Sequence, residues 1–190
     1  TGDWSSVVCS SDLTLIFRPF ATPTDLFFVV GQKLGYMDFE NIRKIMEWSV
    51  RKKAYGKTNS YEVTLEQIYQ ELEYQAGVPK AAGMNAEIET ELEFCFGNPY
   101  MREVFQTFNR ELEGTGKKII CVSDMYLPSH VLKQLLIKCG FQGIHEVYVS
   151  CEAGASKSEG SLFGVVEAKI RAERNLTAKE PLVFVHIGDN

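Results

Sequence analysis

Residues that suit phosphate chemistry follow four separate apolar runs of this sequence. In chain order they are Ser10, Asp12, Thr14, Ser123, Lys157 and Asp189. Hydroxyl groups donate hydrogen bonds to phosphate oxygens, an ammonium group supplies a compact positive charge, and carboxylates hold magnesium. Together these side chains would suit a phosphate group and a hard cation, provided that the fold brings them to one place.

The four apolar runs are the predicted strands of the molecule. They cover Val7–Cys9, Ile119–Val122, Val147–Val149 and Leu182–Ile187. β-Branched residues dominate the runs without alternation, which is typical of strands buried on both faces of a parallel sheet. Helical spacing over Ser129–Cys139 and over 162–170 separates the last three runs. We therefore predict a Rossmann-like α/β core, in which the carboxyl ends of the strands meet at one crevice.

About 100 residues between the first two runs have a helical pattern instead. The predicted helices are Pro23–Leu34, Phe39–Lys53, Thr64–Tyr74, Met84–Phe96 and Asn98–Leu112. Thr64 and Gln67 form a capping-box pattern, and Asn98 is the predicted N-cap before a proline at the first helical position. Met84–Phe96 also fits an alternating strand, but its glutamates favour a helix. We predict no strand in this insertion.

The insertion is therefore expected to be an all-helical cap over the ligand crevice. The predicted core consists of 1–19 and 114–190, and the predicted cap of 20–113. Within the cap, Arg51–Ser60 is the most loop-like stretch, and a solvated helix face is predicted for Glu87, Glu89, Glu91 and Glu93.

Composition excludes several function classes. The 190 residues include 20 Lys and Arg against 25 Asp and Glu, a net charge of −5, which disfavours nonspecific nucleic-acid binding. No apolar run approaches the roughly 20 residues that span a bilayer, and the N-terminus lacks a signal-peptide pattern. Five cysteines without paired spacing indicate reduced thiols and a cytoplasmic chain. The three histidines lack metal-binding spacing.

Four motifs, in this order and with this insertion, resemble those of the haloacid dehalogenase-like (HAD) hydrolases. The family motifs are a strand followed by DxDx[TV], a strand ending in Ser or Thr, a Lys before a helix, and a late GDxxxD. Thr14, Ser123 in IICVSDMYLP, Lys157 in SKSEGSLF and Asp189 in VHIGDN match them in turn. LIFRP, SDMYLP, SKSEGSLF and HIGDN together resemble a bacterial branch of predicted HAD hydrolases, some of which are joined to glycosyltransferase domains.

The resemblance implies a magnesium-dependent phosphatase acting on a phosphorylated small molecule. It aligns Ser10 with the Asp nucleophile of the family and Asp12 with the acid/base residue two positions later. It further implies phosphate binding by Thr14, Ser123 and Lys157, magnesium binding by Asp12 and Asp189, and a fused or associated glycosyltransferase domain as partner.

Two departures from the family pattern bear on activity. A Ser10 hydroxyl is a poor nucleophile without an adjacent base, and it removes an anionic magnesium ligand. A register that makes Asp12 the nucleophile would put Ile16 at the Thr position. In addition, the sequence stops inside the fourth motif, which predicts a core truncated at its C-terminal end.

Other interpretations of these residues stay open. A noncatalytic HAD-like module that binds a phosphorylated ligand or a partner domain fits the missing nucleophile. A phosphoreceiver domain is disfavoured by the long insertion. Arg18 is either a substrate contact at the cap hinge or part of a structural ion pair.

Overall fold

The computed structural model describes residues 5–10 and 14–188, with side chains over 14–188. A four-stranded sheet has the order β5-β4-β1-β6, and every neighbouring pair is parallel. Its strands are β1 (Ser5–Ser10), β4 (Lys118–Ser123), β5 (Glu146–Val149) and β6 (Val183–Ile187). The predicted parallel α/β core is therefore confirmed, and each strand lies within a few residues of its predicted position.

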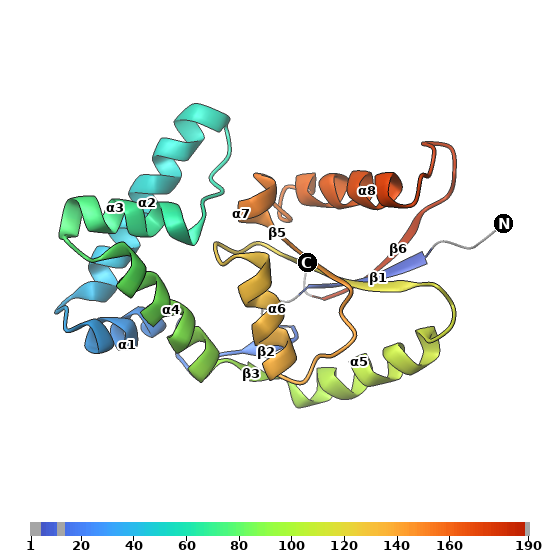
Figure 1. The fold of residues 1–190 in the computed structure, drawn as a ribbon, viewed down its shortest axis with the longest axis horizontal. Helices are drawn as coiled ribbons and strands as arrows, with labels where there is room; N and C mark the ends of the chain where they lie inside the picture. The colour runs from blue at the N-terminus through green and yellow to red at the C-terminus, as the bar shows by residue number, and fades with distance from the viewer. Residues whose placement is uncertain (1–4, 11–13, 189–190) are drawn as a thin grey trace.

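The described residues also form helices and two short strands, which Figure 1 labels. They are β2 (Ile16–Phe17), α1 (Asp25–Leu34), α2 (Phe39–Thr58), α3 (Leu65–Ala76), α4 (Lys80–Phe94), β3 (Phe96–Gly97), α5 (Pro99–Leu112), α6 (Ser129–Lys138), α7 (Ser150–Ala153) and α8 (Ser161–Glu173). Among the described helices, none combines the length and the apolar character that a bilayer crossing requires.

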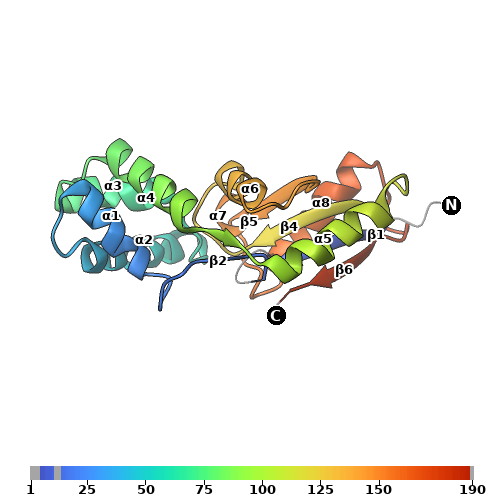
Figure 2. The same ribbon diagram turned by 90° about the horizontal axis from the view of Figure 1, so that it is seen from below.

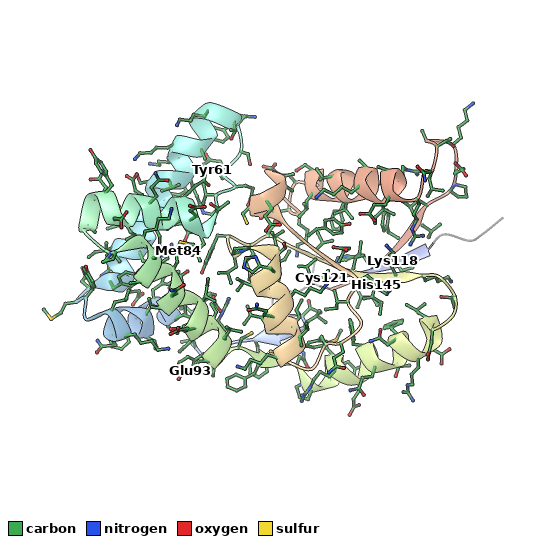
Figure 3. All side chains as sticks on the ribbon, in the orientation of Figure 1. Tyr61, Met84, Glu93, Lys118, Cys121 and His145 are labelled. Atoms are coloured by element: carbon green, nitrogen blue, oxygen red, sulfur yellow. The ribbon has the colours of Figure 1, made fainter. Side chains whose placement is uncertain are left out.

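Helices cover both faces of the sheet, so the interior strand β4 is buried on both sides (Figure 2). Ile119 and Cys121 belong to the apolar cluster that includes residues of α5 and α6. Ile120 and Val122 belong to a second cluster with α8. Because successive side chains of a strand point to opposite faces, β4 connects two helical layers. Figure 3 shows Cys121 near the centre of this arrangement.

β6 differs from the prediction, because it is not buried on both faces. Val183 and Val185 are each nearly half exposed. Among the described strands β6 pairs only with β1, so it lies at an edge of the sheet. The β-branched run predicts a strand correctly but does not distinguish an edge strand from a central one.

Helices α1 to α4 pack against one another beside the sheet (Figure 1). The capping box is confirmed, since the Thr64 hydroxyl accepts from the Gln67 amide and the Gln67 side chain accepts from the Thr64 amide. The stretch with an ambiguous pattern is helical in α4. The loop prediction for Arg51–Ser60 is wrong, because α2 continues to Thr58, and its extension begins with the good helix formers of Arg51–Ala54.

A short antiparallel ribbon joins α1–α4 to the sheet, which corrects the prediction of a strand-free, all-helical insertion. β2 pairs with β3 across the two connections. The chain then enters α5, which lies along the sheet rather than among α1–α4 (Figures 1 and 2). Phe105 of α5 meets Phe141 edge to face at 5.4 Å between ring centroids. The segment 20–113 therefore contains two structural groups, α1–α4 and α5.

Gly97 allows the ribbon to approach the core closely. A Cβ atom at this position would lie 2.3 Å from the carbonyl oxygen of Cys139, a backbone atom that cannot rotate away.

We expect Gly97→Ala to lower the free energy of unfolding by about 1–3 kcal/mol, measured by urea denaturation. In Gly164→Ala, on α8, the new Cβ meets nothing within 4 Å, so stability should stay or rise by up to about 1 kcal/mol. Equal losses in both variants would contradict the close-approach argument.

Candidate functional site

The carboxyl ends of β1, β4 and β5 meet at one edge of the sheet. Ser10 is the last residue of β1 and its Cα lies opposite Val122. Ser123 ends β4 opposite Val149, and its side chain is fully buried. The backbones of Ser10 and Ser123 are therefore one register step apart on neighbouring strands. The Ser10 side chain, Asp12 and Asp189 lie outside the described side chains.

Asp124 organises the loop that carries Lys157. Its carboxylate accepts hydrogen bonds from the backbone amide of Lys157, from that of Ser158 at 3.1 Å and from the Ser156 hydroxyl at 3.2 Å. Hydrogen bonds to an ionised carboxylate are stronger than those between neutral groups. Asp124 thus ties the end of β4 to the loop before α8 and fixes the backbone of Lys157 near the strand end.

Asp124 directly follows Ser123 in the second motif, and the motif pattern assigns no role to it. Its partners, Ser156 to Ser158, follow more than 30 residues later in the chain. The available signal was an acidic residue directly after a buried strand, together with a serine-rich loop that needs an acceptor.

Asn98 holds the segment that carries Thr14. Its side-chain amide donates to the Thr14 carbonyl at 3.3 Å, and its backbone amide donates to the Leu15 carbonyl at 2.8 Å. Its side-chain oxygen accepts from the amides of Tyr100 and Met101, which caps α5 as predicted. The half-buried Thr14 is therefore positioned by the first turn of α5.

The described residues do not supply a magnesium site by themselves. Within 14–188, no three His, Cys, Asp or Glu side chains gather closely enough to hold a metal ion. Asp124 directs both carboxylate oxygens at the Ser156–Ser158 loop. The predicted ligands Asp12 and Asp189 lie outside the described residues, so the donor set of this part of the chain does not fit the ion.

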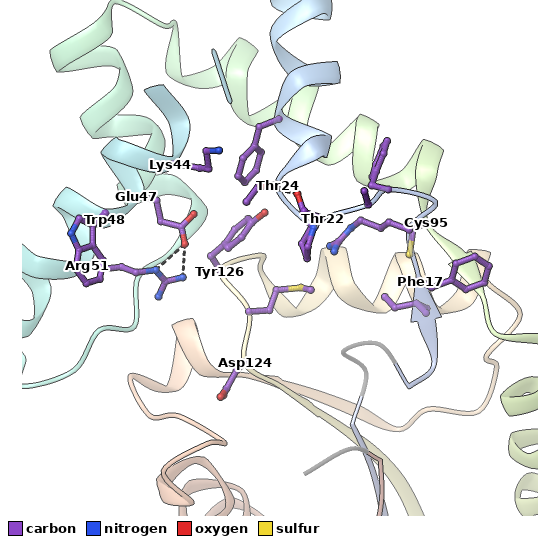
Figure 4. A pocket seen from close by; sticks show the side chains of 17 residues that line it. Phe17, Thr22, Thr24, Lys44, Glu47, Trp48, Arg51, Cys95, Asp124 and Tyr126 are labelled. Carbon is purple, nitrogen blue, oxygen red and sulfur yellow. Dashed lines mark hydrogen bonds and ion pairs between the residues drawn. The ribbon is translucent and has the colours of Figure 1, made fainter. Parts of the chain in front are cut away.

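A cavity of about 800 Å³ lies between the sheet edge and the helices α1–α4 (Figure 4). Its wall consists of residues from the segment 16–24, Phe27 of α1, residues of α2, Cys95, and residues 124–126 after β4. Asp124 lies at the end nearest the sheet, whereas Trp48 and Arg51 lie on the α2 side. The cavity therefore adjoins the loop that Asp124 holds.

Arg18 lines the cavity and forms an ion pair with α4. A structural ion pair was one of the two roles predicted for this residue. Its guanidinium contacts the Glu91 carboxylate at 2.6 and 2.8 Å. Burial raises the pKa of Glu91, and the positive charge of Arg18 opposes that rise. The ion pair connects the end of the β2 connection to α4.

The prediction that four glutamates of α4 form a solvated face is wrong for two of them. Glu87 and Glu91 are buried, whereas Glu89 and Glu93 are exposed. Residues four apart share a helix face, and this face points toward two arginines from earlier segments. The buried pair therefore has partners that the local sequence does not show.

Arg43 is the fully buried partner of Glu87. Its Nε and Nη2 atoms each lie 2.9 Å from the Glu87 carboxylate, and its Nη1 lies 2.7 Å from Glu47. The guanidinium also lies 4.5 Å from the Phe27 ring centroid and 5.0 Å from that of Tyr126. Burial lowers the pKa of Arg43, but the charges of Glu87 and Glu47, the Tyr126 side chain and the hydrogen bond to Glu87 together outweigh it and raise the pKa. Because Tyr126 follows β4, this cluster also joins the helices to the core.

Glu62, in the loop between α2 and α3, brings a further carboxyl group to the sheet edge. It is hydrogen-bonded to Ser150, whose hydroxyl oxygen accepts from the Met125 amide at 3.0 Å. Burial raises the pKa of Glu62, while the Ser150 hydrogen bond and the Arg51 charge partly oppose the rise. The raised pKa means that the folded state favours the protonated form of this carboxyl group.

We expect this contact to make stability depend on pH. The contribution of protonated Glu62 is present below the unfolded pKa of about 4.3 and is lost as pH rises through the higher folded pKa. Glu62→Gln should therefore melt at a higher temperature than the parent at pH 7, with a difference that shrinks toward pH 4. Glu89→Gln, an exposed carboxyl on α4, is the control. A pH-independent difference for Glu62→Gln would contradict the assignment.

Comparison with known proteins identifies the fold. No family model and no curated protein sequence matches this chain. Among solved structures, a HAD family enzyme from Bacteroides thetaiotaomicron is 13% identical with a TM-score of 0.57, covering 100% of this chain and 86% of that one. L-2-haloacid dehalogenase from Xanthobacter autotrophicus is 10% identical with a TM-score of 0.53, covering 96% and 69%. At these identities, structural similarity is evidence for the fold alone. This chain has the HAD-like fold that its four motifs predict.

Proposed function

We propose that this chain binds phosphate esters of small molecules at the carboxyl edge of its sheet, and that its reaction class is HAD-type phosphate-ester hydrolysis. The proposal rests mainly on the hydrogen bonds between the Asp124 carboxylate and the Ser156–Ser158 loop. These hydrogen bonds keep the backbone of Lys157 close to the strand end at Ser123, and the proposal places its ammonium group on the phosphoryl oxygens. The HAD-like fold supports the hydrolase class, and the residue set supports phosphate as the group that is bound.

Each residue has a stated role in this proposal. Lys157 offsets the charge of the phosphoryl oxygens, and the hydroxyls of Ser123 and Thr14 donate hydrogen bonds to them. In this reaction class the side chain at position 10 forms a bond to phosphorus while the ester bond to the leaving oxygen breaks, and Asp12 gives that oxygen a proton. We assign magnesium to the carboxylates of Asp12 and Asp189, and the bound ion would further offset phosphoryl charge.

Cavity size favours a phosphate ester over a haloacid as the ligand. The Xanthobacter dehalogenase has also been solved with chloropropionic acid covalently bound, at 12% identity and a TM-score of 0.50 over 95% of this chain and 69% of that one. Chloropropionic acid is a three-carbon acid, whereas pockets near 800 Å³ enclose much larger ligands. The proposed site therefore has room for a substantial leaving group.

Ser10 favours a second function, a noncatalytic module for a phosphorylated ligand or a partner domain. A serine hydroxyl lacks the charge of the carboxylate that the family uses for attack. The proposed phosphate contacts of Ser123 and Lys157 do not depend on residue 10. In either case we propose a cytoplasmic setting and a fused or associated glycosyltransferase domain as partner.

Asp124→Asn tests the phosphate site. The amide keeps the side-chain shape, but its NH2 group faces donors where a carboxylate oxygen accepted. We expect the affinity for orthophosphate to fall about 10- to 100-fold, measured by isothermal titration calorimetry. Glu159→Gln, an exposed carboxyl in the same loop, should change that affinity less than about twofold. Full affinity in Asp124→Asn would contradict the proposal.

A further inference from the structure

We infer that the ligand of this site is an aryl phosphate monoester, whose flat ring fills the cavity beside Asp124. The inference rests on the proposed function and concerns the part of the ligand beyond the phosphoryl group. The cavity begins at Asp124, which holds the Lys157 loop, and extends between residues 16–24 and α2 (Figure 4). A phosphoryl group at the sheet edge would therefore direct its ester group into this space.

The size of the cavity requires a large ester group. Its volume of about 800 Å³ lies within the range of roughly 300–1,000 Å³ that is common for pockets enclosing drug-sized ligands. A phosphate bound at the sheet edge leaves most of this space for the ester group. A one- to three-carbon group would fill little of it, whereas a fused two-ring system fits.

Aromatic side chains from four parts of the wall line the space: the segment 16–24, α1, α2 and residues 124–126. They include Phe20, Phe27, Trp48 and Tyr126. Trp48 is half exposed, and its ring lies parallel to that of Tyr61, within 3° and 6.3 Å between centroids. Tyr61 in turn stacks on Tyr55 at 4.3 Å. This stack supports the Trp48 ring from outside the cavity, and aromatic walls favour flat aromatic ligands.

Polar groups of the wall already have partners within the protein. Arg18 pairs with Glu91, and Arg51 pairs with Glu47. The Thr22 hydroxyl lies 3.0 Å from the Thr24 hydroxyl and donates to Asp25 at 2.6 Å. A sugar or another polyol would bury hydroxyl groups here without new partners, which is costly. These contacts favour an aryl ester over a sugar phosphate.

Calorimetric titration with 1-naphthyl phosphate, glycerol 2-phosphate and orthophosphate tests the inference. We expect 1-naphthyl phosphate to bind at least about tenfold more tightly than glycerol 2-phosphate, which has a similar charge but no ring. Trp48→Ala should reduce this ratio at least about threefold, and Trp48→Phe should keep most of it. Tyr74→Ala removes an exposed aromatic ring of α3 outside the cavity wall and should leave the ratio unchanged.

The outcomes separate this inference from the proposed function. Orthophosphate binding with no preference for 1-naphthyl phosphate overturns the inference and leaves the phosphate site intact. A preference that survives in Trp48→Ala also overturns it, because the ring would then bind elsewhere. If none of the three compounds binds, the proposed function fails, and the inference fails with it.

Discussion

Ser10→Asp is expected to raise the rate of phosphate release from a small phosphate ester by at least about 100-fold. An aspartate carboxylate carries the negative charge that a serine hydroxyl lacks, and loss of a nucleophile costs up to about a millionfold in well-studied hydrolases. Position 10 ends β1 with its backbone opposite Val122 of β4, so it lies at the same edge of the sheet as Ser123. The measurement is steady-state phosphate release with magnesium present.

Ser10→Asn is the matched control, because asparagine has the size of aspartate without its charge. It should leave phosphate release at the level of the parent chain. Ser10→Asp combined with Asp12→Asn should lose most of the gain, since Asp12 is the proposed proton donor. No gain in Ser10→Asp, with orthophosphate binding retained, would contradict the hydrolytic proposal and favour the noncatalytic module.

Arg43→Met is expected to destabilise the protein by about 3–5 kcal/mol, the largest stability effect that we predict. The substitution leaves the Glu87 carboxylate buried without its cation, and Tyr69 still donates to that carboxylate at 2.6 Å. It also removes the cation that lies over the rings of Phe27 and Tyr126. Urea denaturation at pH 7 measures the loss.

Two companion variants separate the buried charge from general loss of packing. Arg43→Met with Glu87→Leu removes both charges, so it should recover much of the lost stability. Lys44→Met breaks the half-buried pair with Glu40 on the same helix and should cost less than about 1 kcal/mol. Equal losses in Arg43→Met and Lys44→Met would contradict a buried ion pair at the centre of α1–α4.

The regular elements of this fold are predictable because their signals are local. Apolar runs predict the four strands, and helical spacing with the caps at Thr64 and Asn98 predicts the helices. The ribbon of β2 and β3 is not predictable, because each strand has two residues and their pairing joins segments about 80 residues apart. A short apolar run also does not reveal that β6 lies at an edge of the sheet.

The site was predictable only in its strand-end positions. Charged residues are exposed by default, and the burial of Glu87 and Glu91 depends on arginines 44 and 73 residues away. The role of Asp124 likewise depends on amides of a loop that follows much later in the chain. The burial and the contacts of side chains with long-range partners are therefore not predictable from the local sequence.

Binding of orthophosphate to the unaltered chain and to Lys157→Met, measured by calorimetry, tests the phosphate site most directly. Methionine keeps the length of the lysine side chain but removes the charge that the proposal places on the phosphoryl oxygens. We predict one bound phosphate per chain and an affinity at least about tenfold weaker in Lys157→Met, which corresponds to about 1.4 kcal/mol. No binding by the unaltered chain, or equal affinities of the two proteins, would contradict the account.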